Sequence, residues 1–191
     1  MKKIAVHLAN GFEEVEALAP VDIWRRAGYE VTTVSITGSQ QVSGSHAIVV
    51  AADQLFEATH YDEFDLLFLP GGMPGASNLD AHTGLANELI KFNKAGKVLA
   101  AICAAPLVLG HKKLLEGKKA CCFPGFEKEL HGANIVDDYL VSDGNIITGK
   151  GMGIAIPFAL QIVARFDSFE KARLLAQKMQ VPLGTLDLVK A

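Results

Sequence analysis

Cysteine is scarce in this sequence: Cys103, Cys121 and Cys122 are the only three, an odd number without a C-x-x-C pair. The two adjacent cysteines cannot easily bridge each other in ordinary disulfide geometry. No cluster of cysteine and histidine stands at the ligand spacing of a structural zinc site. We therefore expect three reduced thiols and no structural metal.

The sequence also lacks an excess of positive charge, because 18 Lys and Arg residues stand against 21 Asp and Glu residues. Nucleic acids and anionic membrane surfaces are bound by clustered basic residues, so neither is expected as the main partner. No apolar run approaches the roughly 20 residues of a membrane-spanning helix. The lysines after Met1 lead straight into an apolar strand-like run rather than a signal peptide, which predicts a cytoplasmic protein.

No repeat, low-complexity tract or long Pro/Gly/Ser linker divides the chain. A length of 191 residues, half of them hydrophobic, is sufficient for one core and short for two. We predict a single domain over residues 1–191.

Short runs rich in Val, Ile and Leu alternate with segments of helical period. This pattern is typical of an α/β fold with a mostly parallel sheet covered on both faces. The expected strands are 4–8, 31–36, 66–69, 98–102 and 146–148, and the expected helices are 13–26, 83–95, 154–166 and 169–179. Residues 41–50 are expected to form a small extra hairpin or edge strands. Ligands of such sheets bind beyond the carboxyl ends of the strands.

Cys103 follows the apolar segment Val98–Ile102 and precedes a segment of helical composition, so it falls on a strand-to-helix turn. The small residues Ala101, Ala104 and Ala105 suit a sharp turn like the nucleophile elbow of hydrolases. A helix amino terminus favours the thiolate, which predicts a lowered pKa for the thiol. The alternative is a small apolar cysteine that fills a gap in the core.

A second apolar strand runs into the glycine-rich loop Pro70–Gly75. The adjacent glycines Gly71 and Gly72 allow the backbone to approach a ligand closely. We expect the amides of Gly72 and Ala104 to form an oxyanion hole facing Cys103. The alternative is an ordinary turn after a strand.

A third loop, Gly149–Gly153, precedes a predicted helix, but its glycine spacing fits neither the dinucleotide-binding nor the phosphate-loop motif. We interpret it as a permissive loop that closes on the site. Lys150 within it is a candidate anion contact.

Glu16 lies on the first predicted helix, at the border of its buried stripe. The stripe is defined by apolar residues at helical spacing: Phe12, Val15, Ala19 and Ile23. A carboxyl at this border needs a partner or a proton, and a protonated Glu16 beside Cys103 would hydrogen-bond the thiolate and relay a proton. The alternative is a surface acid. Glu13 and Glu14 are expected to be solvated residues of the first turn.

The chain resembles the DJ-1/ThiJ/PfpI superfamily, of the class I glutamine amidotransferase-like group, over nearly its whole length. The resemblance is carried by segments in matching order and spacing: Gly11–Glu16, Pro20–Ile23, Arg25–Gly28, Leu69–Gly72, Ala100–Pro106 and Gly151–Gly153. Because Ala104 rather than histidine follows Cys103, the chain is most similar to the bacterial DJ-1-like branch.

The resemblance implies a flavodoxin-like three-layer sandwich and a homodimer. It implies that Cys103 is an oxidation-sensitive nucleophile and that Glu16 is its protonated carboxyl partner. The same resemblance places Gly71, Gly72 and Ala104 around the thiol, with the last two as amide donors. It implies no cofactor.

Two positions depart from relatives in this family. Phe123 stands where some members have a histidine, which removes the evident general base of a Cys-His hydrolase. His46 stands where relatives can carry an arginine bordering the pocket, so anion recognition is expected to be weaker.

These residues favour a cofactor-free glyoxalase III or deglycase acting on methylglyoxal, glyoxal or their early adducts with amines and thiols on proteins or nucleotides. The main alternative is an oxidative-stress sensor or chaperone in which Cys103 is oxidised to sulfinic acid. An intracellular protease or amidase, or a thiamine-biosynthesis role, is a third reading. It rests more on family names than on residues.

Overall fold

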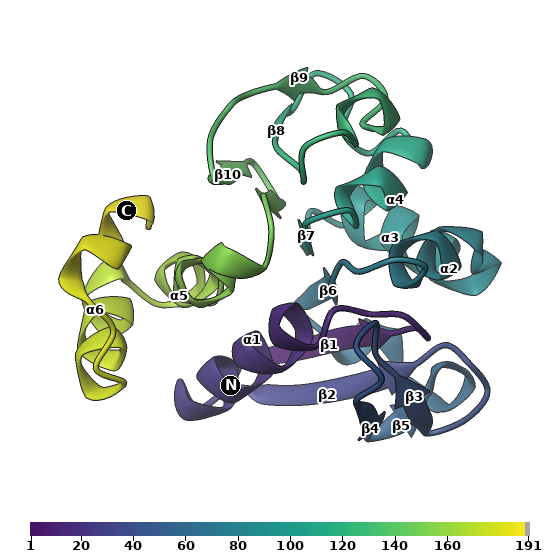
Figure 1. The fold of residues 1–191 in the computed structure, drawn as a ribbon, viewed down its shortest axis with the longest axis horizontal. Helices are drawn as coiled ribbons and strands as arrows, with labels where there is room; N and C mark the ends of the chain where they lie inside the picture. Colours follow the sequence, from purple (N-terminus) through teal and green to yellow (C-terminus); the bar gives the residue numbers. More distant parts are fainter. Residues whose placement is uncertain (190–191) are drawn as a thin grey trace.

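The computed structural model describes residues 1–189 of the chain. In this part of the chain, the central sheet has seven strands in the order β10-β11-β7-β6-β1-β2-β5 (Figure 1). All neighbouring strands pair in parallel except β10, which runs antiparallel to β11. The strands of this sheet are β1 (Lys3–Leu8), β2 (Glu30–Ser35), β5 (Gln54–Leu55), β6 (Leu66–Leu69), β7 (Val98–Ile102), β10 (Leu140–Asp143) and β11 (Ile146–Gly149).

Helices cover both faces of the sheet and complete three layers (Figure 1). One face packs against α1 (Glu14–Arg26) and α5 (Ala155–Phe166), and α6 (Phe169–Lys178) packs on the outer side of α5. The other packs against α2 (Gly75–Ala81), α3 (Thr83–Lys94) and α4 (Pro106–His111).

The strands are apolar without interruption because successive side chains enter opposite cores. Val6 and Phe68 lie in the core under α1 and α5, whereas their chain neighbours Ala5 and Leu67 lie in the core under α3 and α4. From β1 the chain adds β2 on one side of the sheet, and then adds β6, β7 and β11 in turn on the other side, so the strand order switches between β1 and β6. This is the switch point at which flavodoxin-like sheets bind their ligands.

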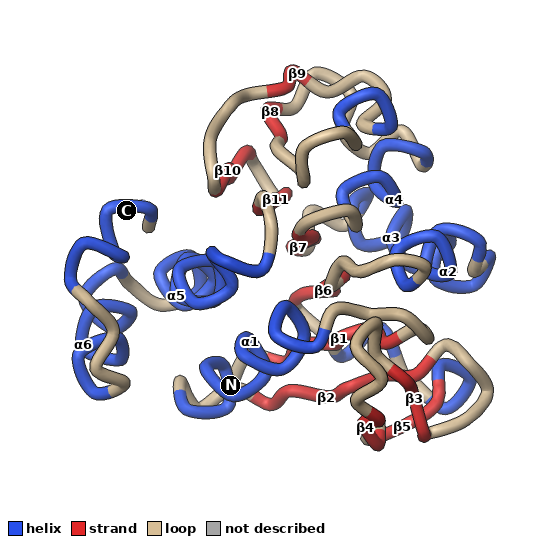
Figure 2. The backbone as a smooth tube through the Cα atoms, in the orientation of Figure 1, coloured by secondary structure: helices blue, strands red, loops and turns tan. Residues whose placement is uncertain are grey.

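Two short pairs of strands lie outside the central sheet. The antiparallel hairpin of β3 (Gln41–Ser43) and β4 (Val49–Ala51) is joined to the segment before α1 by a bridge between Phe12 and Gly44. Figure 2 shows the second pair, β8 (Lys119–Ala120) and β9 (Asn134–Ile135), on a mostly irregular excursion between α4 and β10. No helix in residues 1–189 has the length and apolarity needed to cross a membrane.

The five predicted strands and four predicted helices are confirmed, with ends that differ by no more than one residue. The predicted hairpin is confirmed as well. The buried face of α1 differs from the predicted stripe, because Val15 is 45% exposed while Glu16 and Ala17 are buried. Glu14, expected in solvent, is also buried, since its carboxylate accepts hydrogen bonds from the His46 amide at 2.7 Å and the Ser45 hydroxyl at 3.3 Å.

Candidate active site

Cys103 lies on a strained turn directly after β7. Its φ is +64°, in the left-handed region that non-glycine residues rarely adopt. The neighbouring backbone holds this conformation, because the Cys103 amide donates to the Gly149 carbonyl and the Phe123 amide donates to the Cys103 carbonyl, both at 2.8 Å. The nucleophile-elbow position predicted for Cys103 is confirmed, and the turn projects its thiol beyond the carboxyl end of the sheet.

Two backbone amides donate to the sulfur of Cys103, from Gly72 and from Ala104. Gly72 has a φ of +88°, and a methyl group on it would lie 2.4 Å from the Glu13 nitrogen, so only glycine fits there. Ala104 is the residue after the elbow. The structure therefore brings both predicted donors to the predicted nucleophile, from the loops that follow β6 and β7.

Glu16 extends from the first turn of α1 and is 1% exposed. Its Oε2 accepts a hydrogen bond of 2.9 Å from the Gly71 amide, and its carboxyl group is hydrogen-bonded to the Cys103 side chain. Its other oxygen, Oε1, is buried without a hydrogen-bond partner among the described residues. The structure thus places the predicted carboxyl against the predicted thiol.

Gly71 allows these groups to meet. A methyl group at this position would lie 2.6 Å from the Cys103 Cβ, 2.6 Å from the Glu16 Oε2 and 2.9 Å from the Ile102 carbonyl oxygen. Two of these contacts are with the side chains of Cys103 and Glu16. A residue larger than glycine would therefore push the thiol and the carboxyl apart. Gly71 therefore serves both as a donor to Glu16 and as the space in which the thiol and carboxyl approach.

Burial raises the pKa of the Glu16 carboxyl from its ordinary 4.5 to about 7. Burial, followed by the charge of an ionised Glu16 and its hydrogen bond, raises the pKa of the Cys103 thiol to about 12, against the lowering effect of the Gly72 and Ala104 amides. The predicted lowering of the Cys103 thiol pKa is therefore wrong, because burial and an ionised Glu16 raise it. The pair loses one proton near neutral pH and holds the other tightly, since two adjacent negative charges repel.

The raised pKa of Glu16 predicts a pH-dependent stability. The folded state holds this proton more tightly than the unfolded chain does, so stability falls as the pH rises from about 4.5 through 7. A difference of 2.5 pKa units corresponds to about 3 kcal/mol. Between pH 4.5 and 8, the free energy of unfolding of the wild type should therefore fall by about 3 kcal/mol relative to that of Glu16→Gln. Urea titration of the two proteins measures this difference. A constant difference between the two proteins would contradict this assignment.

An apolar cavity of about 420 Å³ has Phe123, Gly151 and Met152 in its lining, and Gly151 separates it from the pair, since neither Cys103 nor Glu16 lines it. A methyl group on Gly151 would lie 3.3 Å from the Phe123 ring and 3.9 Å from the Glu16 Oε1, so this loop covers the unpartnered carboxyl oxygen. Phe123 and Met152 are both about half exposed. The loop predicted to close on the site does so. The sequence identified Phe123 only as a departure from relatives and Met152 only as part of the loop Gly149–Gly153, because nothing in their local pattern shows that they line one cavity.

Lys150 is paired with Asp137 and lies 5.2 Å from the centre of the Tyr139 ring. Its charge is therefore already compensated, which argues against the predicted anion contact. His46 likewise bonds Glu14, through its Nδ1 at 2.8 Å. For metal binding, Cys103 and Glu16 provide one thiol and one carboxyl, fewer than the three protein ligands of a catalytic zinc site.

The fold and the site together define an α/β protein of flavodoxin-like topology with a cysteine at the nucleophile elbow and a buried glutamate as its partner. The sequence matches the model of the DJ-1/PfpI family over residues 2–165. The chain belongs to the DJ-1/PfpI family.

Known members of the family are similar in sequence and in structure. Protein DJ-1 homolog B of Arabidopsis thaliana is 38% identical over 90% of this chain, which spans only 40% of the plant protein, and homolog A is matched over 44% of its length. Protein dj-1beta of Drosophila melanogaster is 36% identical over 94% of this chain and 97% of its own. Oxidized DJ-1 of Toxoplasma gondii superposes with a TM-score of 0.91 at 33% identity, covering 94% of this chain and 98% of its own.

Proposed function

We propose that this protein is a cofactor-free enzyme of the glyoxalase III or deglycase type, acting on methylglyoxal, glyoxal or their early adducts on proteins or nucleotides. One arrangement carries the proposal: the Cys103 thiol, two amide donors and a buried carboxyl with a pKa near 7 converge at one point. Together they supply a nucleophile, stabilisation for a developing oxyanion and a group that exchanges protons at neutral pH.

The mechanism begins with transfer of the thiol proton to the ionised Glu16 carboxylate, as the Cys103 sulfur adds to the aldehyde carbon of methylglyoxal. The resulting hemithioacetal carries the charge on its oxygen, beside the amides of Gly72 and Ala104. Glu16 returns its proton to this oxygen and then, as a carboxylate, removes the proton of the former aldehyde carbon to give an enediolate. It delivers that proton to the neighbouring carbon, while the hydroxyl proton of the former aldehyde passes to the oxygen of that neighbouring carbon, and a thioester forms. Water releases lactate and restores the thiol. The sum is methylglyoxal plus water to lactate, with no net change in oxidation state.

The apolar cavity lined in part by Gly151 is suited to the uncharged body of the substrate. The half-exposed side chains of Phe123 and Met152 offer contact to a methyl group or to the chain that carries an adduct. With Phe123 in place of a histidine, Glu16 is the titratable group hydrogen-bonded to the thiol. This favours proton transfer within one substrate over hydrolysis of an amide.

The test is lactate formation from methylglyoxal by the wild-type protein in the absence of glutathione, followed by ¹H NMR in deuterated water. Transfer of the carbon-bound proton by Glu16 predicts lactate with partial deuterium at C2, because the carboxyl exchanges with solvent. Absence of lactate, with free aldehyde and with a methylglyoxal-treated peptide alike, would reject the proposal.

A second candidate function is a redox sensor, and it is supported by the oxidized state of the similar Toxoplasma gondii DJ-1. In this chain, peroxide would oxidise Cys103 to sulfenic and then sulfinic acid, with water as the other product. The amides of Gly72 and Ala104 are placed to donate to the new oxygens, and a protonated Glu16 is a third donor. Mass spectrometry showing two added oxygens at Cys103, in a protein that forms no lactate, would favour this function.

We further propose that the protein is a homodimer, as its family membership favours, and that it works in the cytoplasm. Val15 at the start of α1 and Ile48 and Val49 in the hairpin segment are about half exposed, and the Glu14 contacts with this segment bring them to one side of the molecule. The three free cysteines suit a reducing compartment. A solution mass near twice 20.4 kDa would support the dimer.

A further inference from the structure

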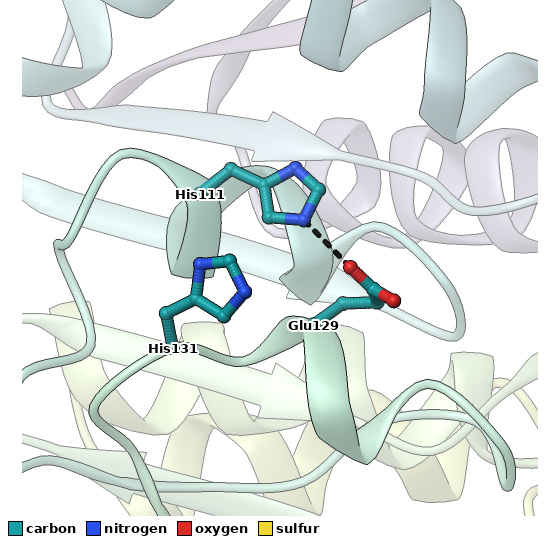
Figure 3. A group of neighbouring side chains, drawn as sticks. All are labelled: His111, Glu129 and His131. Carbon is teal, nitrogen blue, oxygen red and sulfur yellow. Dashed lines mark hydrogen bonds and ion pairs between the residues drawn. The ribbon is translucent and has the colours of Figure 1, made fainter.

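Three potential metal ligands meet at the end of α4, on the far side of that helix from its Cys103 turn. Figure 3 shows His111, the last residue of α4, with its ring beside that of His131 and facing the carboxylate of Glu129. The centres of the two rings are 5.0 Å apart, and the Nε2 of His111 lies 2.9 Å from the Glu129 Oε2. One donor atom from each of the three residues lies within 4.8 Å of the others.

We propose that His111, Glu129 and His131 bind a divalent transition metal ion of the zinc type. Two imidazoles and one carboxylate are a donor set that zinc uses with three protein ligands and a fourth, open position. The proposal is independent of the chemistry at Cys103. The metal would join the end of α4 to the turn that contains Glu127–Glu129, two elements separated by 15 residues of irregular chain and short strand.

A second carboxylate orients His111 in the way that metal-binding histidines require. The Nδ1 of His111 lies 2.8 Å from the Asp80 Oδ2, and Lys112 holds Asp80 through contacts of 2.8 Å to its Oδ1 and 3.0 Å to its carbonyl oxygen. A proton on Nδ1 leaves the Nε2 lone pair facing the Glu129 carboxylate. In this tautomer either a second proton on the imidazole or a cation bridges Nε2 and the carboxylate, and a metal ion fills this role with His131 as a further ligand.

The backbone that presents these ligands is tightly packed. A methyl group on Gly110 would lie 2.2 Å from the Glu129 carbonyl oxygen and 2.9 Å from the His131 nitrogen, so α4 touches the ligand-bearing turn directly. Leu130, between the two ligands, is 3% exposed and fixes the turn in the core. The anchored backbone keeps the ligands in place, whereas the exposed His131 ring is free to turn by the small amount that coordination requires.

Charge and spacing also favour a cation. When the His111 ring is neutral, Asp80 and Glu129 contribute two negative charges against one positive charge on Lys112. Tetrahedral zinc places its ligand atoms about 3.3 Å apart, so the present spread of up to 4.8 Å would narrow when the ion binds. Sequence reasoning missed the site because His111 and the other two ligands stand 18 and 20 residues apart, far from any zinc-motif spacing.

The test is calorimetric titration with Zn²⁺ of the full chain, in the wild type and in Cys103→Ser, so that binding at the reactive thiol is recognised. We expect one site per chain that persists in Cys103→Ser and is lost in both His111→Ala and His131→Ala. Asp80→Asn, which disturbs the orientation of His111 and removes the ion pair with Lys112, should weaken binding by about 10- to 100-fold. His60→Ala removes an exposed histidine elsewhere and should bind as the wild type does.

Thermal unfolding supplies a second readout. Zn²⁺ should raise the melting temperature of the wild type and leave that of His131→Ala unchanged, because a ligand that binds only the folded state stabilises it. His131 is exposed, so its replacement should not prevent folding. Absence of Zn²⁺ binding by the wild type, or equal affinity in His131→Ala, would overturn the proposal and leave a proton as the bridge between His111 and Glu129.

Discussion

Replacing Cys103 by serine is expected to lower the rate of lactate formation from methylglyoxal by about a thousandfold or more. The hydroxyl of serine is a far weaker nucleophile than a thiol, and Phe123 leaves it without a histidine to remove its proton. The amide donors from Gly72 and Ala104 would remain, but they stabilise charge only after a nucleophile has added. The measurement is the initial rate of lactate formation at saturating methylglyoxal, compared with the wild type.

Cys122→Ser is the matched control for this variant. Cys122 is 3% exposed and lies next to Phe123, whose amide donates to the Cys103 carbonyl, so its replacement removes a nearby thiol without removing the nucleophile. We expect Cys122→Ser to retain most of the activity after correction for the folded fraction, measured by circular dichroism. Equal losses in the two variants would show that the effect of Cys103→Ser is structural, and unchanged activity in Cys103→Ser would exclude covalent catalysis by this residue.

Replacing Glu16 by glutamine is expected to lower lactate formation by about 100- to 10,000-fold, the usual contribution of a positioned acid or base. The amide of glutamine has nearly the shape of the carboxyl and still accepts a hydrogen bond from Gly71, but it cannot carry a proton between two carbons. The same change removes the negative charge that raises the pKa of the Cys103 thiol. The nucleophile should therefore ionise more readily while turnover falls.

These opposite effects distinguish proton transfer by Glu16 from mere support of the thiol. The rate of Cys103 alkylation by iodoacetamide at pH 7 should be equal or higher in Glu16→Gln, whereas lactate formation should be strongly reduced. A parallel fall of both rates would indicate that Glu16 acts by stabilising the thiolate and not by moving the substrate proton. Glu57→Gln, which neutralises an exposed glutamate outside the site, should leave both rates unchanged.

Much of the fold could be predicted because its strands are short and apolar throughout. Leu66–Leu69 and Val98–Ile102 coincide with β6 and β7, since a strand covered on both faces needs apolar residues at every position and ends where glycine or a tight turn follows. The position of Cys103 on the elbow followed from the same boundary. The short strands β8 and β9 were not predicted, because two-residue strands form only where the tertiary structure brings them together.

The face of α1 shows the limit of pattern reasoning. Periodicity favoured Val15 as a core residue, yet the helix is rotated so that Glu16 and Ala17 face inward. Apolar spacing alone could not show this, because the cost of burying Glu16 is reduced by the Gly71 amide and the Cys103 side chain, which lie 55 and 87 residues further along the chain. The thiol pKa was mispredicted for the same reason: a helix terminus is a local feature, whereas desolvation and the Glu16 charge are not.

The sequence by itself determined the layers of this protein, the end of the sheet at which chemistry is possible and the position of Cys103 on the elbow, because these depend on hydrophobic period and on residues adjacent in the chain. Only the tertiary structure decided which acid faces the thiol, that burial raises the pKa of both groups and that His111, Glu129 and His131 form a cluster. These properties depend on burial and on distances between segments, and both arise only when the chain is packed.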